Sequence, residues 1–188
     1  MNGVRRDLYT SSACGAALSH YREEYGLETR IVRFHNIFGL GTWDGGREKA
    51  SAAICRKVAM AKFAGASEVE IWGDGEQTRS FCFIDDCVTG IRKLMESDYP
   101  EPLNLGQDRM VTINQLVDIV AQIAGVRVTK KHVPGPQGVR GRNSDNTRLR
   151  KVLSWEPTIS LEEGLERTYA WIEDQVRRLG MPTARERR

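Results

Sequence analysis

The sequence predicts an α/β fold, and three features carry that prediction. Short runs rich in β-branched and apolar residues, at 29–34, 68–72 and 103–105, alternate with amphipathic or small-residue helical patterns. The stretch 33–57 gathers polar side chains where a strand ends and the next helix begins, which is where open α/β sheets place their ligands. The chain has 188 residues, enough for one domain with its own core.

The composition is that of a soluble globular protein, with 40% apolar and 28% charged residues and a net charge of +3. The basic excess collects near the end without interleaved aromatic residues, so we interpret residues 180–188 as a disordered basic tail rather than a nucleic-acid site. No run reaches the ~18 apolar residues of a membrane span, and the N-terminus lacks a signal-peptide core. The four cysteines form no CxxC pair, which indicates reduced thiols in a cytoplasmic protein, and no metal site is predicted.

The elements of the first half follow from residue spacing and turn residues. A helix is expected at 11–25, ended by Gly26, and a strand at 29–34. After a glycine-rich loop, residues 48–63 form a helical pattern with a small-residue face. The later elements are a strand at 68–72, a hairpin-type turn at Gly73-Asp74-Gly75, a strand at 79–84 and a helix at 86–96 capped by Asp85.

The second half is more often interrupted by proline and glycine. Its expected elements are a strand at 103–105, an extended segment at 110–113, a helix at 114–124, a weak strand at 126–133, a short helix at 149–153 and a last helix at 161–179. Residues 134–146, PGPQGVRGRNSDN, are too polar and too rich in glycine and proline for regular structure. Loops of this kind often carry function.

Asn36 and His35 come directly after the first predicted strand. A carboxamide offers a ligand both a donor and an acceptor, so Asn36 is a candidate ligand-binding residue. The alternative is a loop asparagine that bonds to nearby backbone. His35 is a weaker candidate base, because a histidine without a paired carboxylate in the sequence is more often a packed or capping residue.

Lys49 is expected in the first turn of the helix at 48–63, beside Glu48. The positive end of a helix repels a lysine unless an anion neutralises it. Lys49 is therefore a candidate phosphate ligand, or a general acid or base. The alternative is a solvated lysine that pairs with Glu48.

Three further cations stand on separate predicted elements. We expect Lys57, Arg79 and Arg142 to converge on one polyanion. Gln77 and Thr78 follow a glycine-bearing turn directly and are expected to line the mouth of the same cleft. The alternatives are exposed charge for Lys57 and a cross-strand pair for Arg79. The predicted convergence of these cations can be tested, because cations that are merely surface charges would lie far apart.

Seven sequence motifs carry a resemblance to a known family: RFHNIFG, GTWDGGREKA, CRK, WGDGEQTRSFCFIDDCVTGI, LNLG, PGPQGVRGRNSDN and LSWEPTISLEEGL. Together they resemble the GDP-mannose 3,5-epimerases, a family of extended short-chain dehydrogenases/reductases, from about His20 to Gln175. RFHN, GGREKA, GDGxQTRSF and GVRGRNSDN are specific to these epimerases, whereas FxxIDD and LNLG are shared by many sugar-nucleotide epimerases and dehydratases. The resemblance implies the carboxyl-terminal part of that fold, an incomplete Rossmann-like sheet plus a small α/β substrate-binding subdomain, as one partial domain over 1–188.

The resemblance also implies an NAD-dependent enzyme that epimerises a GDP-sugar and assembles as a dimer. By position, Lys49 matches one half of the family's catalytic acid/base pair and a substrate contact. The other positions that match the family's substrate-binding residues are Asn36, Glu48, Ala50, Lys57, Gln77, Thr78, Arg79 and Arg142.

The sequence departs from the family in its first residues. No glycine-rich NAD fingerprint is present, and Asp7 and Ser11 occupy the positions of the family's Tyr-xxx-Lys pair. We therefore expect a carboxyl-terminal half that is inactive alone, with unpaired apolar edges on the strands at 29–34 and 103–105. Two alternatives stay open: a non-catalytic paralogue that dimerises with and regulates a full-length epimerase, and a fragment of another sugar-nucleotide enzyme, such as a UDP-sugar epimerase or a dehydratase.

Overall fold

The structure is a computed structural model that describes residues 17–18, 20–21, 23–26, 28–44, 48–135 and 139–179. Its named helices are α2 (Ala50–Ala64), α3 (Ile84–Met95), α4 (Ile113–Ala124), α5 (Thr147–Leu153) and α6 (Leu161–Arg178). Its strands are β1 (Val32–Phe34), β2 (Ile37–Phe38), β3 (Glu68–Trp72), β4 (Thr78–Ser80), β5 (Cys82–Phe83), β6 (Leu103–Leu105), β7 (Met110–Thr112), β8 (Thr129–Val133) and β9 (Gly141–Arg142). The helix predicted at 11–25 lies largely outside the described residues, although those described between 17 and 25 are helical.

The strands pair mostly in parallel, which is the pattern that helical crossovers produce. β1 pairs with β6, β2 with β5 and β3 with β8, each in parallel. β4 lies between β7, which is antiparallel to it, and β9, which is parallel. The predicted α/β class is therefore confirmed, as a set of short and partly parallel sheets.

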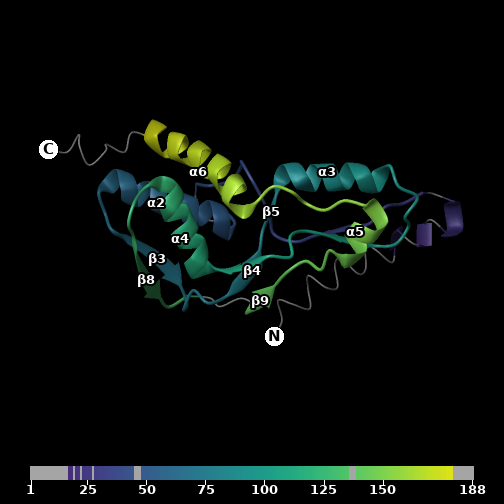
Figure 1. Cartoon of the computed structure of the whole chain (residues 1–188), viewed down its shortest axis with the longest axis horizontal. Helices are drawn as coiled ribbons and strands as arrows, with labels where there is room; N and C mark the ends of the chain where they lie inside the picture. Colours follow the sequence, from purple (N-terminus) through teal and green to yellow (C-terminus); the bar gives the residue numbers. More distant parts are fainter. Residues whose placement is uncertain are drawn as a thin grey trace.

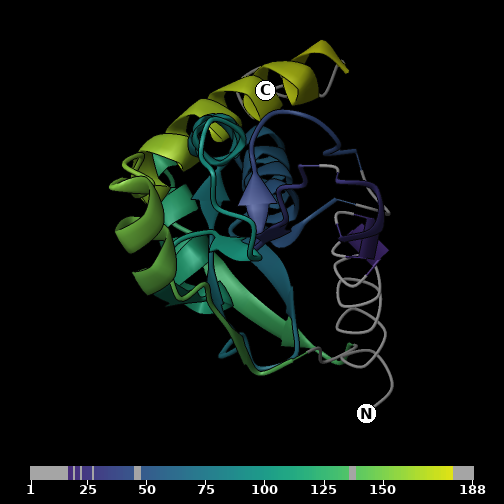
Figure 2. The same ribbon diagram turned by 90° about the vertical axis from the view of Figure 1, so that its right-hand side faces the viewer.

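The main core lies where α2, α4 and α6 meet the inner face of β3 and the side chains of Phe81, Phe83 and Val111. Figure 1 shows these helices together above β3 and β8, and Figure 2 shows α6 as the outer layer on that side. Cys55, Val58, Leu116, Leu165 and Ile172 have no exposed surface. Each fully buried Leu or Ile contributes about 1.5–3 kcal/mol relative to an exposed one, so this cluster is the main source of stability.

Local sequence signals fix where these helices begin and end. Thr112 Oγ1 accepts from the Gln115 backbone N–H at 3.0 Å, and Gln115 Oε1 accepts from the Thr112 N–H at 2.9 Å, a capping box that starts α4. Ser160 Oγ accepts from the Glu163 N–H at 3.1 Å at the start of α6. Gly65 and Gly125 end α2 and α4 in the left-handed conformation, both at φ 66°.

A smaller cluster lies at the other end of the molecule, where α3 and α5 are found (Figure 1). Its buried members are Cys87, Leu105 and Leu149. Gly90 of α3 allows close packing on β6, because a Cβ there would lie 2.6 Å from the Leu105 side chain. Within the described residues β1 pairs with β6 alone, and Phe34 on β1 is 48% exposed.

The predicted hairpin at Gly73-Asp74-Gly75 is wrong in its pairing. The turn exists, with φ 75° and 72° at its two glycines, but β3 pairs with β8 while β4 pairs with β7 and β9. Asn114 explains the difference, because its backbone N–H donates to Gly75 O at 3.0 Å and its Nδ2 donates to Asp74 O at 3.0 Å. Anchored on the start of α4, the turn carries the chain from one sheet to another.

Asp85 does not cap α3, which is a second correction. The helix begins at Ile84 with Phe83 as its N-cap, so Asp85 and Asp86 both lie in the first turn, where carboxylates favour the helix dipole. Asp86 is 4% exposed and accepts from the Ile159 backbone N–H at 2.7 Å. The charges of these two carboxylates stabilise the start of the helix. The hydrogen bond that Asp86 accepts also joins α3 to the segment that leads into α6.

Three of the four cysteines fall within the described residues, and they are free thiols as predicted. Cys55, Cys82 and Cys87 are buried, and burial raises the pKa of Cys55 and of Cys82 to about 12. The predicted basic tail at 180–188 lies outside the described residues. Across the part of the chain that the structure describes, no helix has both the length and the apolar character that crossing a bilayer requires.

Candidate functional site

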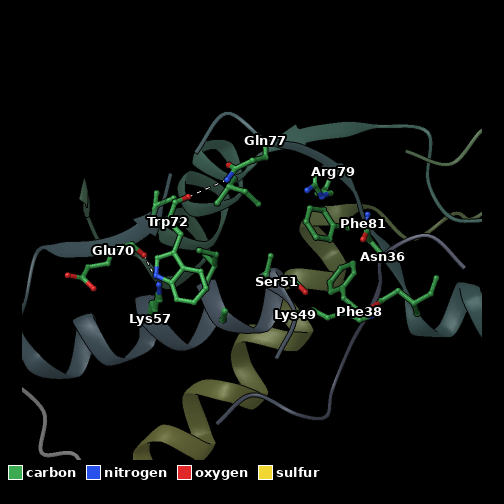
Figure 3. Close-up of a pocket in the computed structure, with 16 residues that line it drawn as sticks. Asn36, Phe38, Lys49, Ser51, Lys57, Glu70, Trp72, Gln77, Arg79 and Phe81 are labelled. Carbon is green, nitrogen blue, oxygen red and sulfur yellow. Dashed lines mark hydrogen bonds between the residues drawn. The ribbon is translucent and has the colours of Figure 1, made fainter. Parts of the chain in front are cut away.

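A cavity of about 400 Å³ opens between the start of α2, strand β3 and the segments 36–38 and 77–81 (Figure 3). This volume falls in the range of small-ligand sites. The predicted site residues that line it are Asn36, Lys49, Ala50, Lys57, Gln77 and Arg79. Glu48, Thr78 and Arg142 do not line it. The structure thus brings six of the nine predicted positions to one cavity, although they come from segments far apart in the sequence.

Asn36 is held in a left-handed conformation, with φ 45°, between β1 and β2. Its Nδ2 donates to Ser80 O at 2.9 Å, and its backbone oxygen accepts from the Cys82 N–H at 3.2 Å. These two bonds fix the carboxamide against the segment that contains β4 and β5. The Oδ1 atom forms no hydrogen bond with the described residues, so it is the atom left to accept a hydrogen bond from a ligand.

Lys49 is the N-cap residue of α2, where no side chain caps the helix. Its exposed Nζ donates to Ile37 O at 3.2 Å at the edge of the cavity. Glu48 is not its partner, because the Glu48 carboxylate is 7% exposed and pairs with Arg56 at 2.7 Å. The alternative of a solvated Lys49–Glu48 pair is therefore wrong. An ammonium at an uncapped helix start is a suitable place for an anionic or proton-exchanging ligand.

Ser51 is a site residue that the sequence did not reveal. It stands in the first turn of α2, is 1% exposed, and lines both the main cavity and a neighbouring cavity of about 280 Å³. Its Oγ finds no hydrogen-bond partner among the described residues. Buried hydroxyls are normally hydrogen-bonded, so this one provides an unused donor and acceptor beside Lys49.

Lys57 and Trp72 form the opposite end of the cavity (Figure 3). Lys57 Nζ donates to Glu70 O at 2.7 Å and lies 5.9 Å from the centroid of the Trp72 ring. Burial lowers the pKa of Lys57, and the nearby Arg56 charge lowers it further. Gln77 Nε2 donates to Trp72 O at 3.3 Å, and its buried Oε1 has no partner within the described part.

Arg79 and Arg142 are register partners on the parallel strands β4 and β9. Arg79 Nη1 donates to Thr78 O at 2.7 Å, and neither arginine pairs with a carboxylate among the described residues. Burial lowers the pKa of Arg79, and the positive charge of Arg142 lowers it further. The alternative of a neutralising cross-strand pair for Arg79 is wrong, since its neighbour carries the same charge. Two adjacent cations without an anion are poised to bind one.

His35 belongs to a packed segment and does not line the cavity. Its backbone N–H donates to Leu105 O at 3.0 Å, and burial is the main factor that lowers its pKa. Gly106 follows β6, and a Cβ there would lie 2.7 Å from that of His35 and 2.6 Å from that of Ser144. The turn after β6 is therefore filled by the chain's own side chains. It does not fit the pyrophosphate of a dinucleotide, which needs an open backbone cradle.

Parallel strands joined by helices, with polar side chains beyond the strand ends and a basic cavity beside them, define the class of open α/β proteins that bind nucleotide-like ligands. Within that class, the chain belongs to the NAD dependent epimerase/dehydratase family, whose model matches residues 6–106. The family name implies NAD. Because the turn after β6 does not fit its pyrophosphate, we derive no reaction step through it.

Relatives in this family are close in sequence and in structure. The GDP-mannose 3,5-epimerase 1 of Oryza sativa subsp. indica is 49% identical over 170 residues, which are 90% of this chain and 43% of that protein. The UDP-glucuronic acid decarboxylase 5 of Arabidopsis thaliana is 35% identical over 77% of this chain and 41% of that protein. The UDP-glucose 4-epimerase of Thermotoga maritima, solved with UDP-glucose, matches with a TM-score of 0.78 and 31% identity over 88% of this chain and 52% of that one.

The predicted resemblance to GDP-mannose 3,5-epimerases is confirmed by these comparisons. The chain spans 43% of the length of the GDP-mannose 3,5-epimerase that it matches. The identity to that protein exceeds the identity to the UDP-sugar enzymes compared above.

Proposed function

We propose that this chain forms the GDP-sugar-binding part of a sugar-nucleotide epimerase. The observation that carries the proposal is the convergence of Lys49, Lys57 and Arg79 on one cavity, with Arg142 on the strand beside it. These cations, two from α2 and its N-cap and one from β4, share a space in which Glu70 is the one acidic lining residue among those described. A nucleoside diphosphate sugar supplies the anionic charge that this arrangement lacks.

The side chains at different parts of the cavity indicate how such a ligand would be oriented. Lys49, the N-cap of α2, and Lys57, in the middle of that helix, are eight residues apart, about 12 Å along the helix axis. We assign the hexose to the Asn36 and Lys49 end, where hydroxyl-binding groups gather, and the diphosphate to Arg79 with Arg142. Polar side chains that accept or donate single hydrogen bonds suit a sugar, whereas guanidinium groups suit phosphate oxygens.

Lys49 is the proposed proton-exchanging group. Its Nζ lies at the cavity edge and is held by one backbone carbonyl, Ile37 O, at 3.2 Å. A lysine held by one acceptor keeps two further N–H groups that as an ammonium can donate to a ligand oxygen or return a proton to carbon, whereas the neutral amine is the form that removes a proton from carbon. The substrate-binding roles of Asn36, Ala50, Lys57, Gln77 and Arg79 are proposed on the same geometry. For Glu48, Thr78 and Arg142 the roles are supported by the family resemblance, with Arg142 also beside Arg79.

The proposed setting is the cytoplasm, supported by the free thiols Cys55, Cys82 and Cys87, since reduced cysteines are usual there. Epimerase activity is not expected from this chain alone, because Asp7 and Ser11 occupy the positions of the family's Tyr-xxx-Lys pair. Association with a full-length epimerase is supported by the strand edge of β1.

Calorimetric titration of the purified chain with GDP-mannose tests the proposal. We expect saturable binding, no turnover when NAD is added, and a loss of affinity on the order of tenfold in Arg79→Met. Arg127→Met is the matched control, since Arg127 is exposed, outside the cavity and unpaired with any carboxylate among the described residues.

Absence of binding at millimolar GDP-mannose would contradict the proposal, as would equal losses in the two arginine variants. Coelution of the chain with a full-length epimerase in size-exclusion chromatography, without nucleotide-sugar binding, would instead support the regulatory alternative.

A further inference from the structure

A second hollow, which we call the α5 pocket, is formed by residues of β1, β6 and the start of α5. Its volume is about 500 Å³, and it shares no lining residue with the cavity described above. It lies at the end of the molecule where α5 is found, away from β3 and β8 (Figure 1). Its charged lining residues are Arg33, Asp145, Arg148 and Lys151. No aromatic side chain is among the described residues that line it.

The three cations of the α5 pocket have no carboxylate partner among the described residues. Arg150, on the same helix, behaves differently, because it donates to Asp108 at 2.6 Å and to Glu156 at 2.9 Å. Helix α5 therefore carries two kinds of basic side chain. Arg150 is neutralised by acids, whereas Arg148 and Lys151 line the pocket without a counter-charge.

Unpaired cations are gathered rather than scattered over the described part of the chain. Four of them line the first cavity or lie beside it, three line the α5 pocket, and Lys93 and Arg127 stand outside both. Solvated surface charges would be dispersed, so the gathering at α5 indicates a second place suited to an anion. The lysines and arginines without an ion pair are Arg33, Lys49, Lys57, Arg79, Lys93, Arg127, Arg142, Arg148 and Lys151.

Asp145, the one acid that lines the α5 pocket, is engaged by the start of the helix. Its Oδ1 accepts from the Thr147 backbone N–H at 2.9 Å. The bonds from the Thr147 backbone and hydroxyl hold the pKa of Asp145 below its ordinary value, and the charge of Arg150 lowers it further. Asp145 forms no ion pair with the cations of the pocket, which therefore keeps an excess of positive charge.

The strands present one side of the pocket in a fixed arrangement. Arg33 on β1 and Asn104 on β6 are register partners on parallel strands, so both side chains leave the same face of the sheet. Leu103 and Leu105, on either side of Asn104, are 1% exposed and belong to the opposite, buried face. The Asn104 amide adds an uncharged donor beside the Arg33 guanidinium.

The start of α5 is anchored on the turn after β6. Asn146 is 2% exposed, its Nδ2 donates to Gly106 O at 2.8 Å, and its backbone N–H donates to Asp108 Oδ1 at 3.0 Å. Leu149 holds the next turn of the helix in the small core. The two cations of α5 that line the pocket are three positions apart, so they share one side of the helix. A ligand would therefore order side chains without having to move the helix.

We propose that the α5 pocket binds a small polyanion with two phosphate groups, to which Arg33 and Arg148 donate paired N–H groups and Lys151 supplies a third positive charge. Two phosphate groups bring about three to four negative charges at neutral pH, which match three cations. Guanidinium groups fit phosphate oxygens through two parallel bonds, and an ammonium acts as a point charge. Because no aromatic ring lines the pocket among the described residues, it offers no stacking surface for a nucleobase.

Calorimetric titration of the full chain with inorganic pyrophosphate tests the proposal. We expect two saturable components in the wild type, one at each group of cations. Arg148→Gln should weaken the component at the α5 pocket on the order of tenfold and leave the other, whereas Arg79→Met should do the reverse. Pyrophosphate should also slow hydrogen exchange in α5 and β6 in the wild type but not in Arg148→Gln.

Two further ligands define the chemistry of the component that Arg148→Gln weakens. Orthophosphate has one phosphate group and should bind there on the order of tenfold more weakly than pyrophosphate. ADP carries the same diphosphate on a nucleoside and should bind there no more tightly than pyrophosphate. A clear gain with ADP would contradict a pocket built for the phosphate groups alone.

Arg127→Gln is the matched control for Arg148→Gln. Both arginines are exposed and without an ion pair among the described residues, but only Arg148 lines the α5 pocket. The two variants change net charge equally, so at constant ionic strength Arg127→Gln should bind pyrophosphate as the wild type does.

Two results would overturn the proposal. One is a single component that Arg79→Met weakens and Arg148→Gln leaves unchanged. The other is an equal loss in Arg148→Gln and Arg127→Gln, which would reduce the effect to net charge. Neither result bears on the proposed sugar-nucleotide site. That site fails instead if GDP-mannose does not bind while the component at the α5 pocket persists.

Discussion

The two ends of the molecule are held together to different degrees. Around α2, α4 and α6 the described residues form a continuous core of 22 buried side chains, whereas around β1 and β6 the corresponding cluster has three. We call these the α2–α4–α6 region and the β1–β6 region. The cavity belongs to the first of them, because its walls are α2, β3 and the segments that pack on that core.

The difference teaches that most of the cavity wall stands on the larger core, whereas Asn36 and Ile37 reach the cavity from the thinner region. The β1–β6 region is tied to the rest by individual polar contacts. Asp86 accepts from the Ile159 N–H at 2.7 Å, and Gln107 Nε2 donates to Pro157 O and Ile159 O at 3.4 Å. Hydrogen bonds of this kind fix the two regions relative to each other but bury little apolar surface. We therefore expect the β1–β6 region to unfold locally before the rest of the protein does.

The largest effect is expected from removing a core leucine. Leu165→Ala, at a fully buried position of α6, should lower the free energy of unfolding by about 2–5 kcal/mol in urea denaturation monitored by circular dichroism. Leu149→Ala makes the same chemical change at a position that is 2% exposed in the small cluster. It should leave the main transition almost unchanged and instead speed hydrogen exchange in α5 and β6.

Equal shifts of the main transition in the two leucine variants would show that the regions unfold as one unit. The α2–α4–α6 region and the β1–β6 region would then not differ in stability.

An intermediate effect is expected from two helical glycines. A Cβ at Gly164 would lie 2.8 Å from Phe38 and Phe83, inside the large core, so Gly164→Ala should destabilise the protein by about 1–3 kcal/mol. A Cβ at Gly90 would lie 2.6 Å from Leu105 and 2.9 Å from Trp155. Those neighbours pack less densely and can yield, so Gly90→Ala should cost less, offset by the helix propensity of alanine, about 1 kcal/mol.

Thermal unfolding of the two glycine variants measures this difference in rigidity. A larger loss in Gly90→Ala than in Gly164→Ala would show that the β1–β6 region is the better packed of the two.

The smallest effect is expected from an exposed ion pair that joins the two regions. Arg109, after β6, donates two hydrogen bonds of 2.8 Å to Glu162 in the first turn of α6. Because both side chains are largely exposed, Glu162→Gln should cost less than about 1 kcal/mol. The bonds from Arg109 hold the pKa of Glu162 below its ordinary value of 4.5. The contribution is therefore present at neutral pH and is lost as the pH falls below that value.

Urea titrations of wild type and Glu162→Gln at neutral and acidic pH test this pH dependence. The difference in free energy of unfolding between the two proteins should shrink at acidic pH. A difference that grows would contradict a stabilising Arg109–Glu162 pair.

The regular elements could be predicted because their signals are local. β3 and β6 have the predicted bounds, and α4 and α6 differ by a residue at one end. The strand predicted at 79–84 is instead two strands, β4 and β5, that pair in different sheets. The two-residue strands β2 and β9 were also missed. Their pairing depends on partners far along the chain, which no local pattern contains.

The site was predictable where charge at a helix start or family motifs marked it. Lys49 stood out because a cation at a helix start needs a reason. Asn36 stood out because it follows a strand, Lys57 and Arg79 as cations on separate elements, and Gln77 because it follows a turn. Ser51, Glu70 and Trp72 were missed for physical causes. An unpaired hydroxyl is visible only once its burial is known, and the exposed face of β3 resembles any amphipathic strand until a cavity is seen beside it.

The order in which the chain is synthesised gives the packing of α2 against α6 a further consequence. On a translating ribosome, α2 and β3 emerge well before β8 and α6, the elements that cover their apolar sides. Val58 and Cys55 must therefore wait in contact with water or with a chaperone until Leu161–Arg178 has been made. A premature stop codon anywhere upstream of Leu161 would leave that apolar surface of α2 permanently without α6 to cover it.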